Sequence, residues 1–404
     1  MSIADFPGRV RPDACPGALQ VHQAADGPLA RVRLPGGAIS PARLLELAAC
    51  AAELGTGVIE LTSRANVQVR GLRSPAAFAA RIAAAGLLPS PSHERVRNIV
   101  ASPLGGRAIM ALVEALDHEL CARPRLAGLP GRFLFALDDG TGDMTALNAD
   151  VTHLNGRLLL AGADSGLALT PESVVPTMLA SAEAFLDERA AQSAEPTNAR
   201  PPGLATAGDQ PGDQEKGQSG GPAPAAAWRI GELPDGPARI AARLGGATTT
   251  GSPLSPAVPH RPGCTAQRDG RVALEVLAPL GRLTPAQART LAAAGPVRLT
   301  PWRSVVVPDL PADQVDDVAR RLEEAGLSAD PRSPWAGVTA CTGRPGCAKS
   351  LADVQADARR WVASLTGPRP TPTHWAGCER RCGLPPGEVT QMVATGDGYQ
   401  ERQQ

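Results

Sequence analysis

Within residues 17–89, some segments place apolar residues at every second position, as in a strand, and others at helical spacing. A strand with alternating apolar side chains comes first, a helix follows, then two more strands and a second helix. Each helix begins at a Ser-Pro pair, in which serine suits the N-cap and proline the first turn, and each ends at a glycine. This β-α-β-β-α order predicts a ferredoxin-like half-domain. Its elements are Leu29–Leu34, a helix from Pro41 to about Glu53, Gly57–Leu61, Asn66–Leu72 and a helix over Ala76–Ala85.

The same pattern returns near residue 270. The segment Leu34-Pro-Gly-Gly-Ala-Ile-Ser-Pro41 is matched by Ala278-Pro-Leu-Gly-Arg-Leu-Thr-Pro285. We therefore predict an α+β protein in which two half-domains, 17–89 and 227–330, arose by duplication and pair about a pseudo-twofold axis. The expected elements of the second unit are Val272–Leu277, a helix from Thr284-Pro285 to Gly295, Val297–Leu299, Ser304–Val307 and a helix over Ala312–Ala325.

Three further segments complete the expected organisation. Residues 90–190 alternate apolar helices with short strands and predict a separate domain. Residues 191–226 contain mostly Pro, Gly, Ala, Gln and Ser, and we expect a disordered linker there, because such a segment buries too little apolar surface to order itself. Residues 331–404 carry half of the eight cysteines and one helix, Leu351–Val362.

Composition limits the partners and the compartment. The 404-residue chain has 40 basic and 40 acidic residues, which argues against nucleic acid or an anionic membrane as the main partner. No apolar run approaches the length of a membrane span, and the N-terminus lacks the apolar core of a signal peptide. We expect a cytoplasmic protein, whose reduced thiols favour metal ligation over disulfides.

Four of these cysteines form two close pairs, C-x5-C at Cys341 and Cys347 and C-x3-C at Cys378 and Cys382. Four thiolates are what a cubane iron–sulfur cluster requires. A tetrahedral zinc site would also take four thiolates, although its pairs are usually two to four residues apart. Two unrelated pairs of buried cysteines are the remaining interpretation.

The sequence segments around these cysteines resemble those of the sulfite and nitrite reductase family, and most of all those of its precorrin-3B synthase branch. Ala340-Cys-Thr-Gly-Arg-Pro-Gly-Cys-Ala348 is similar to the branch's first cysteine loop, and His374-Trp-Ala-Gly-Cys-Glu-Arg-Arg-Cys-Gly383 to its second. Ala376 and Arg380 depart from the family's Ser and Lys. The resemblance implies a cofactor domain after each half-domain, so that 90–190 is the first and 331–404 an iron–sulfur domain, a truncated second cofactor domain.

The resemblance also implies a tetrapyrrole site. Thr62-Ser-Arg-Ala-Asn-Val-Gln-Val-Arg-Gly71 resembles the family motif T-x-R-x-N-x-Q, and Arg298-Leu-Thr-Pro-Trp-Arg-Ser304 lies at the corresponding place in the second repeat. Period-two alternation puts the polar residues of the first segment on one face, which could also be a solvated strand face. Arginine suits carboxylates because its planar fork binds them bidentately. The expected tetrapyrrole contacts are Arg64, Asn66, Gln68, Arg70, Arg97, Asn98 and Arg303.

The expected function follows from the resemblance. It implies an O2-dependent monooxygenase that converts precorrin-3A to precorrin-3B, with a [4Fe–4S] cluster on Cys341, Cys347, Cys378 and Cys382 and a mononuclear non-haem iron whose ligands the sequence does not reveal. The alternative is a sirohaem-dependent sulfite or nitrite reductase, and a third interpretation is a non-enzymatic cluster- or zinc-binding module. No nucleotide-binding motif is evident, so electrons must come from an external donor or reductase. The sequence identifies no catalytic side chain.

Overall fold

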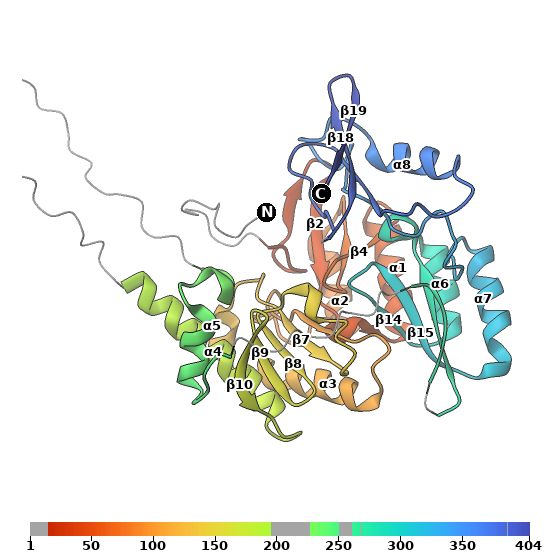
Figure 1. Cartoon of the computed structure of the whole chain (residues 1–404). Helices are drawn as coiled ribbons and strands as arrows, with labels where there is room; N and C mark the ends of the chain where they lie inside the picture. Colours follow the sequence, from red (N-terminus) through yellow and green to blue (C-terminus); the bar gives the residue numbers. More distant parts are fainter. Residues whose placement is uncertain (1–14, 195–226, 250–260, 268, 386) are drawn as a thin grey trace, which may run out of the picture.

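Two five-stranded sheets form the centre of the protein (Figure 1). The computed structural model describes residues 15–194, 227–249, 261–267, 269–385 and 387–404. The first sheet has the order β1-β2-β5-β4-β13 and the second the order β11-β12-β15-β14-β3. Their strands are β1 (His22–Ala24), β2 (Gly27–Val32), β3 (Ala38–Ile39), β4 (Ile59–Leu61), β5 (Val67–Val69), β11 (Gly263–Ala266), β12 (Val272–Leu277), β13 (Arg282–Leu283), β14 (Val297–Leu299) and β15 (Ser304–Leu310).

The two sheets exchange one short strand each. Strand β13 of the second repeat pairs with β4 of the first, with Leu283 opposite Ile59, while β3 of the first repeat pairs with β14 of the second, with Ile39 opposite Val297. Reciprocal exchange is the arrangement that a pseudo-twofold relation between the repeats requires. The duplicated ferredoxin-like α+β fold expected from the sequence is confirmed.

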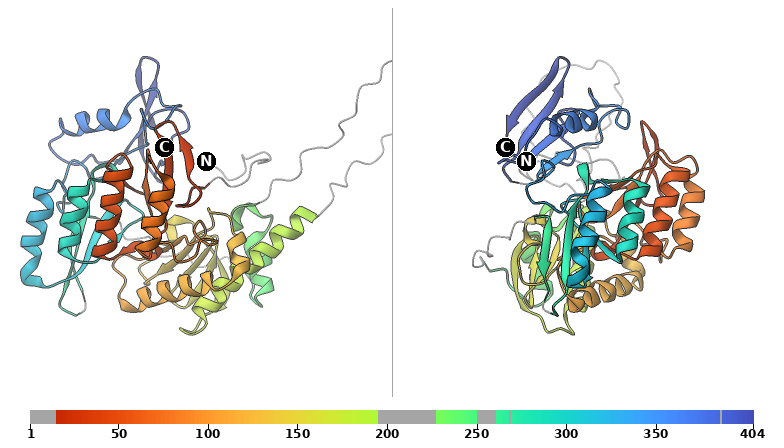
Figure 2. Two further views of the ribbon diagram at one scale, coloured as in Figure 1. Left: turned by 180° about the vertical axis from the view of Figure 1, so that it is seen from behind. Right: turned by 90° about the vertical axis from the view of Figure 1, so that its right-hand side faces the viewer.

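Four helices cover one face of both sheets in the row α2-α1-α6-α7 (Figure 2). Their apolar stripes pack on the inward-facing strand residues in a continuous core. Thr284 and Gln287 form a capping box at the start of α6. The expected N-cap residue Ser40 is extended, but its hydroxyl makes no capping bond. The helices are α1 (Pro41–Leu54), α2 (Pro75–Ala84), α6 (Pro285–Ala294) and α7 (Val315–Glu324), the last preceded by a short 3-10 turn, Ala312–Gln314.

Equivalent loops of the two repeats dock different domains. In the first repeat, Gly36 has φ 61° and packs closely on α3 (Arg107–Cys121), since an added Cβ would lie 3.1–3.2 Å from the side chains of Val113 and Met110. In the second repeat the same place holds Leu280, also with positive φ, whose side chain belongs to the core around Trp375. Each half-domain is therefore attached to its following domain through one such turn.

The domain that follows the first half-domain, predicted above as the first cofactor domain and called so below, contains a sheet of order β10-β9-β8-β7-β6, in which β6, β7 and β8 are parallel. The strands are β6 (Ile99–Ala101), β7 (Phe135–Asp138), β8 (Val151–Leu154), β9 (Arg157–Leu160) and β10 (Ala163–Ala168), packed with α3, α4 (Val174–Ala194) and 3-10 turns at Pro124–Gly128 and Thr145–Leu147.

Residues 227–249 differ from the expected division. They were assigned to the second half-domain, but α5 (Gly236–Arg243) packs against α4, and Ile230, in a 3-10 turn (Ile230–Glu232), and Ile240 lie in the first cofactor domain's core. Two arginines of α5, Arg239 and Arg243, form ion pairs with the buried carboxylate of Glu188 in α4. Burial of the apolar side of α5 thus decides its place. The expected linker begins within α4, and residues 195–226 lie outside the described part.

The last domain has a sheet of order β16-β17-β18-β19, with β16, β17 and β18 parallel and β19 antiparallel. Trp375 packs against Trp361 and Tyr399 at ring-centroid distances of 5.7 and 4.8 Å. Across the part of the chain that the structure describes, no helix has the length and apolar character needed to span a membrane. The elements are β16 (Val338–Ala340), α8 (Val354–Val362), β17 (Thr373–Ala376), β18 (Thr390–Thr395) and β19 (Gly398–Gln403).

Candidate functional site

The pairing of two parallel strands brings the cysteine motifs together. Cys341 directly follows β16, and Cys378 follows β17 after one glycine. The carboxyl ends of neighbouring parallel strands meet at the same sheet edge. Cys341 N–H donates to Trp375 O (2.9 Å), and Gly377 N–H donates to Cys341 Sγ (3.2 Å). A Cβ at Gly377 would lie 1.9 Å from Ser350 Oγ, so only glycine fits there.

All four thiols belong to one electrostatic group. Burial raises the pKa of Cys341, and neighbouring Cys382 and Cys347 raise it further, against the N–H groups of Gly377 and Gly343. Burial also raises the pKa of the Cys382 thiol, and Cys378 and Cys347 add to this. Four thiolates this close repel one another unless metal ions lie among them.

The spacing of these sulfur atoms is wider than a single zinc ion requires. A tetrahedral site with Zn–S bonds of about 2.3 Å places its sulfurs about 3.8 Å apart. Among the described His, Cys, Asp and Glu residues, the groups of three or more that come within 4.8 Å of one another include no three of these cysteines. A cubane cluster, with one cysteine per iron, separates its ligands further. Four cysteine thiolates match the one ligand per iron that a [4Fe–4S] cluster takes.

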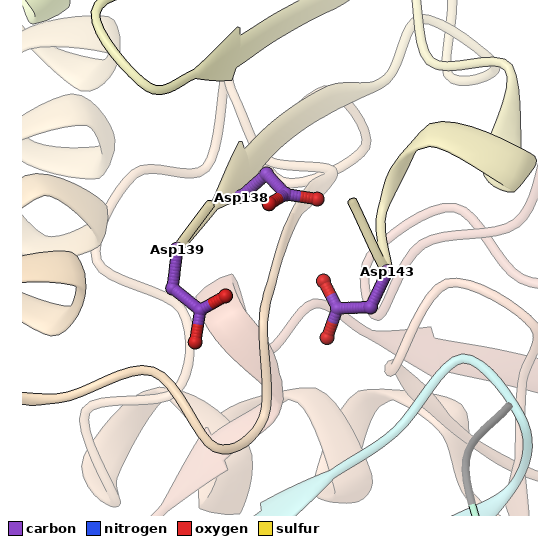
Figure 3. A group of neighbouring side chains, drawn as sticks. All are labelled: Asp138, Asp139 and Asp143. Atoms are coloured by element: carbon purple, nitrogen blue, oxygen red, sulfur yellow. The ribbon is translucent and has the colours of Figure 1, made fainter. Parts of the chain in front are cut away.

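Three carboxylates at the end of β7 and in the loop that follows it have oxygen atoms within 4.8 Å of one another (Figure 3). They are Asp138, Asp139 and Asp143. Asp138 accepts hydrogen bonds of 2.8–2.9 Å from three N–H groups of its own loop. Asp143 accepts one from Ser102 Oγ (2.6 Å), and that oxygen in turn accepts Asp139 N–H (3.0 Å). These bonds within the chain itself account for the shape of this turn-rich loop.

A row of four polar side chains crosses the first sheet on the face opposite the helices. Arg31 of β2 lies opposite Gln68 of β5, Gln68 opposite Glu60 of β4, and Glu60 opposite Arg282 of β13. Arg31 Nη2 donates to Gln68 Oε1 (3.1 Å), Gln68 Nε2 to Glu60 Oε2 (2.6 Å), and Arg282 Nη1 to Glu60 Oε1 (2.7 Å). The neighbouring residues of each strand point into the apolar core, so this face is not simply a solvated one.

Three arginines at one end of this row form what we call the arginine cluster: Arg31, Arg33 and Arg64. Burial lowers the pKa of Arg33 to about 10, and the charges of Arg31 and Arg64 contribute. Burial, Arg229 and Arg31 lower the pKa of Arg64 to about 10 as well. Within the described residues, the buried atoms Arg31 Nε and Arg33 Nη1 have no hydrogen-bond partner. The positive charge is buried at Arg33 and partly buried at Arg31 and Arg64. Such charge, together with N–H groups that lack a partner, is the chemistry of an anion site.

An N-terminal turn covers the arginine cluster. Arg31 Nη1 and Arg33 Nη2 donate to Cys15 Sγ at 3.5 and 3.4 Å. The turn is held by Glu94, whose carboxylate accepts three backbone N–H groups of residues 18–20 at 2.6–3.1 Å. A Cβ at Gly17 would overlap the Glu94 carboxylate, at 2.3 Å. The turn therefore places a thiol sulfur against two guanidinium groups.

Two of the expected tetrapyrrole contacts, Asn66 and Asn98, are buried and form hydrogen bonds between domains. Asn66 Oδ1 accepts Leu34 N–H (2.8 Å), and Asn66 Nδ2 donates to Asn98 Oδ1 (3.3 Å). Asn98 Nδ2 and Arg64 Nη1 both donate to Gly131 O, at 2.9 and 3.1 Å. Both asparagines are 1% exposed. They hold Arg64 in place against the first cofactor domain.

The other expected arginines have different partners. Arg70 forms a bidentate ion pair with Asp26, and Arg97 forms one with Asp117. Arg303 has φ 66° and donates to Gly383 O (3.3 Å), beside Cys382.

Arg303 links the cysteine loop to the polar row. It is close enough to Glu60 and His374 to interact electrostatically with both. Burial, with the charge of Arg303, lowers the pKa of His374 to about 4, so this imidazole is neutral at pH 7. Arg303 and Arg64 thus lie toward the same polar face rather than on opposite surfaces.

Ala376 and Arg380, the two residues that differ from the family motif, lie in different environments. Ala376 is fully buried in β17. Arg380 is exposed, and its charge lowers the pKa of Cys382 against the larger effect of burial.

Sequence reasoning missed several members of this site, namely Cys15, Arg31, Arg33, Glu60, Arg282 and His374. A signal for part of the set was present. Arg31 and Arg33 alternate with apolar residues in Leu29–Leu34, and Glu60 lies between Ile59 and Leu61. Period-two alternation places each on the face opposite the core.

Comparison with known proteins agrees with this architecture. The model of the nitrite/sulfite reductase ferredoxin-like half domain matches residues 22–79 and again 265–325. The ferredoxin–nitrite reductase of Synechococcus elongatus is 26% identical over 414 aligned residues, which cover 88% of this chain and 74% of that enzyme. The precorrin-3B synthase of a Sinorhizobium species is 40% identical over 63 residues, 16% of this chain and 14% of that protein.

The structure of the NirA protein of Mycobacterium tuberculosis has the same fold. It superposes with a TM-score of 0.67 at 18% identity and covers 93% of this chain and 73% of NirA. The chain is therefore similar to nitrite and sulfite reductases in its two half-domain segments, and it shares the fold of NirA.

Proposed function

We propose that this protein is an iron–sulfur oxidoreductase that binds a polycarboxylate tetrapyrrole between the arginine cluster and the four cysteines. The observation that supports the proposal is the arginine cluster, three guanidinium groups on one face, two of which have a buried N–H group without a partner among the described residues. A tetrapyrrole with several carboxylates supplies the missing negative charge. The cysteines, Arg303 and the polar row lie along the same face.

The roles of the protein's own groups follow from their positions. Arg31, Arg33 and Arg64 would bind carboxylates through charged hydrogen bonds, with Gln68 and Glu60 fixing the row. Cys341, Cys347, Cys378 and Cys382 would hold a [4Fe–4S] cluster, which supplies electrons one at a time when bound. Neutral His374 keeps a buried polar group beside Cys382 without adding charge. Arg303 would contribute positive charge between cluster and ligand.

A sirohaem-dependent nitrite or sulfite reductase is the first candidate. The sequence alone favoured the precorrin-3B synthase, but the match to a ferredoxin–nitrite reductase extends over 88% of the chain, whereas the precorrin-3B synthase match extends over 16%. The longer match reverses the order of the two. In this function the tetrapyrrole is a resident cofactor, and an external donor of the ferredoxin type delivers the electrons.

The O2-dependent conversion of precorrin-3A to precorrin-3B is the second candidate. The local identity of 40% over 63 residues and the cysteine words support it. In this function the tetrapyrrole is the substrate, and two electrons from an external donor reduce the second oxygen atom of O2 to water. A mononuclear iron for this chemistry remains a prediction without assigned ligands.

One preparation separates the two candidates. The full-length protein is purified anaerobically, and its visible spectrum is read together with its iron and sulfide content. Sirohaem bands and six-electron reduction of nitrite or sulfite by a chemical reductant support the reductase. A cluster-only spectrum, with 18O from labelled O2 in the hydroxyl of a product made from precorrin-3A, supports the monooxygenase instead. Absence of both iron and sulfide overturns the proposal as a whole.

A further inference from the structure

We propose that Arg70 and Asp26 form a brace that positions the first cysteine loop, and through it the cluster, relative to the arginine cluster. Arg70 Nε and Nη2 donate to the Asp26 carboxylate at 2.8 and 2.9 Å, and the same Nη2 donates to Gly346 O at 2.6 Å. Gly346 directly precedes Cys347. The inference rests on the proposed cluster, since it concerns how the chain holds one of its ligands.

The brace belongs to the first half-domain and not to the domain that contains the cysteines. Arg70 immediately follows β5, and Asp26 lies in the turn between β1 and β2. Both partners of the ion pair therefore belong to the first half-domain. The Arg70 and Asp26 side chains are only 9% and 16% exposed, so the pair is little screened by solvent.

The cysteine loop fits closely over this ion pair. A Cβ at Gly346 would lie 2.9 Å from Asp26 Oδ2 and 3.2 Å from Arg70 Nη2. The other end of the loop is held by the bond from Cys341 N–H to Trp375 O. Cys341 is thus positioned by its own sheet. Cys347 has a local bond from its N–H to Gly343 O (2.8 Å), and the residue before it is also held by a contact 276 residues away along the chain.

The place of Arg70 explains why such a brace matters. Arg70 is two residues from Gln68, and both project from the polar side of β5. Arg282, at the other end of the row, interacts with both Arg70 and Asp26. The strand that carries a member of the polar row therefore also holds the cluster loop. Such a connection sets the separation between cluster and tetrapyrrole without requiring rigidity elsewhere.

The chain offers a matched control in Arg97 and Asp117. This pair is also bidentate, at 2.7 and 2.6 Å, and its side chains are 6% and 19% exposed. It lies between the start of the first cofactor domain and α3. Asp26→Asn and Asp117→Asn each remove one carboxylate charge from a similarly buried arginine, so the general cost to folding is comparable.

The test uses full-length protein purified without oxygen. Iron and sulfide per chain, the decay of visible absorbance under a chelator, and the EPR spectrum of the reduced cluster are measured. We expect Asp26→Asn to lose its cluster about ten- to a hundredfold faster than wild type and to show a shifted EPR signal, since a charged hydrogen bond to the loop is weakened. Asp117→Asn should match wild type in both readouts, and Arg70→Lys, which keeps the charge without the fork, should be intermediate.

Each outcome has a defined meaning. Equal decay rates and EPR signals in Asp26→Asn and Asp117→Asn overturn the brace. Wild-type protein without iron and sulfide overturns the proposed cluster and not the brace alone. If Asp26→Asn does not fold, Arg70→Lys carries the same test, and a wild-type decay rate in that variant counts against the proposal.

Discussion

Replacing Arg64 by methionine should weaken tetrapyrrole binding without weakening the fold. Methionine has a similar length but carries no charge and no donor. Within the described residues, the Arg64 guanidinium donates one hydrogen bond, from Nη1 to Gly131 O at 3.1 Å. Its pKa is lowered to about 10, mainly by burial and by the charge of Arg229. The protonated side chain is thus less favourable in the folded protein than in the unfolded chain at every pH below about 10.

The two consequences of the change have opposite signs. A charged hydrogen bond to a ligand carboxylate contributes about 1.5–3 kcal/mol, so the variant should bind about ten- to a hundredfold more weakly. Loss of the bond to Gly131 costs about 1 kcal/mol of folding free energy, and removal of a buried like charge offsets this. The midpoint of thermal unfolding should therefore stay close to wild type or rise. A purely structural arginine would lower it.

Binding is followed by quenching of the fluorescence of uroporphyrin, a tetrapyrrole with eight carboxylates, over a range of salt concentrations. Arg64→Lys tests whether charge alone suffices, and we expect partial recovery. Arg332→Met is the control, because that side chain is 87% exposed and, among the described residues, pairs with nearby Asp330. Its affinity and salt dependence should equal wild type. Wild-type affinity in Arg64→Met, or a large fall in its unfolding midpoint, would refute the reasoning.

Three further outcomes are expected. Cys378→Ser should lose most bound iron and sulfide, whereas Cys264→Ser should keep them; the reverse result would show that the ligand set is wrong. Alkylation of Cys15 by iodoacetamide, followed by mass spectrometry, should slow when uroporphyrin occupies the arginine cluster, and an unchanged rate would place the ligand elsewhere. Burial lowers the pKa of His153 below its usual 6.5. The unfolded chain therefore binds more protons as pH falls through 6.5, so stability falls with it. His153→Gln should lose less stability than wild type between pH 7.5 and 5.5 in urea unfolding, and identical losses would contradict this assignment.

The sequence determined the half-domains because their pattern is local. Strand Val272–Leu277 and helix Pro285–Ala294 were expected with these bounds. Thr284-Pro285 and Gly295 mark the ends of the helix, and the spacing of apolar residues distinguishes the helix from the strand. The cysteine spacing likewise indicated a shared metal site from residues close together in the chain. Repeated words indicated the duplication before any contact was known.

Only the tertiary structure decided how the polar residues divide their work. Arg64 and Arg70 belong to one motif and share a face, yet Arg64 joins a cluster of like charges while Arg70 is occupied by Asp26 and the cysteine loop. Asp26 and Gly346 are far from Arg70 in sequence order, so no local pattern could reveal the pairing. The same holds for α5, whose apolar side is buried against α4 rather than in the following repeat. Burial and charge pairing between residues far apart in the sequence depend on the folded arrangement, so local sequence patterns do not predict them.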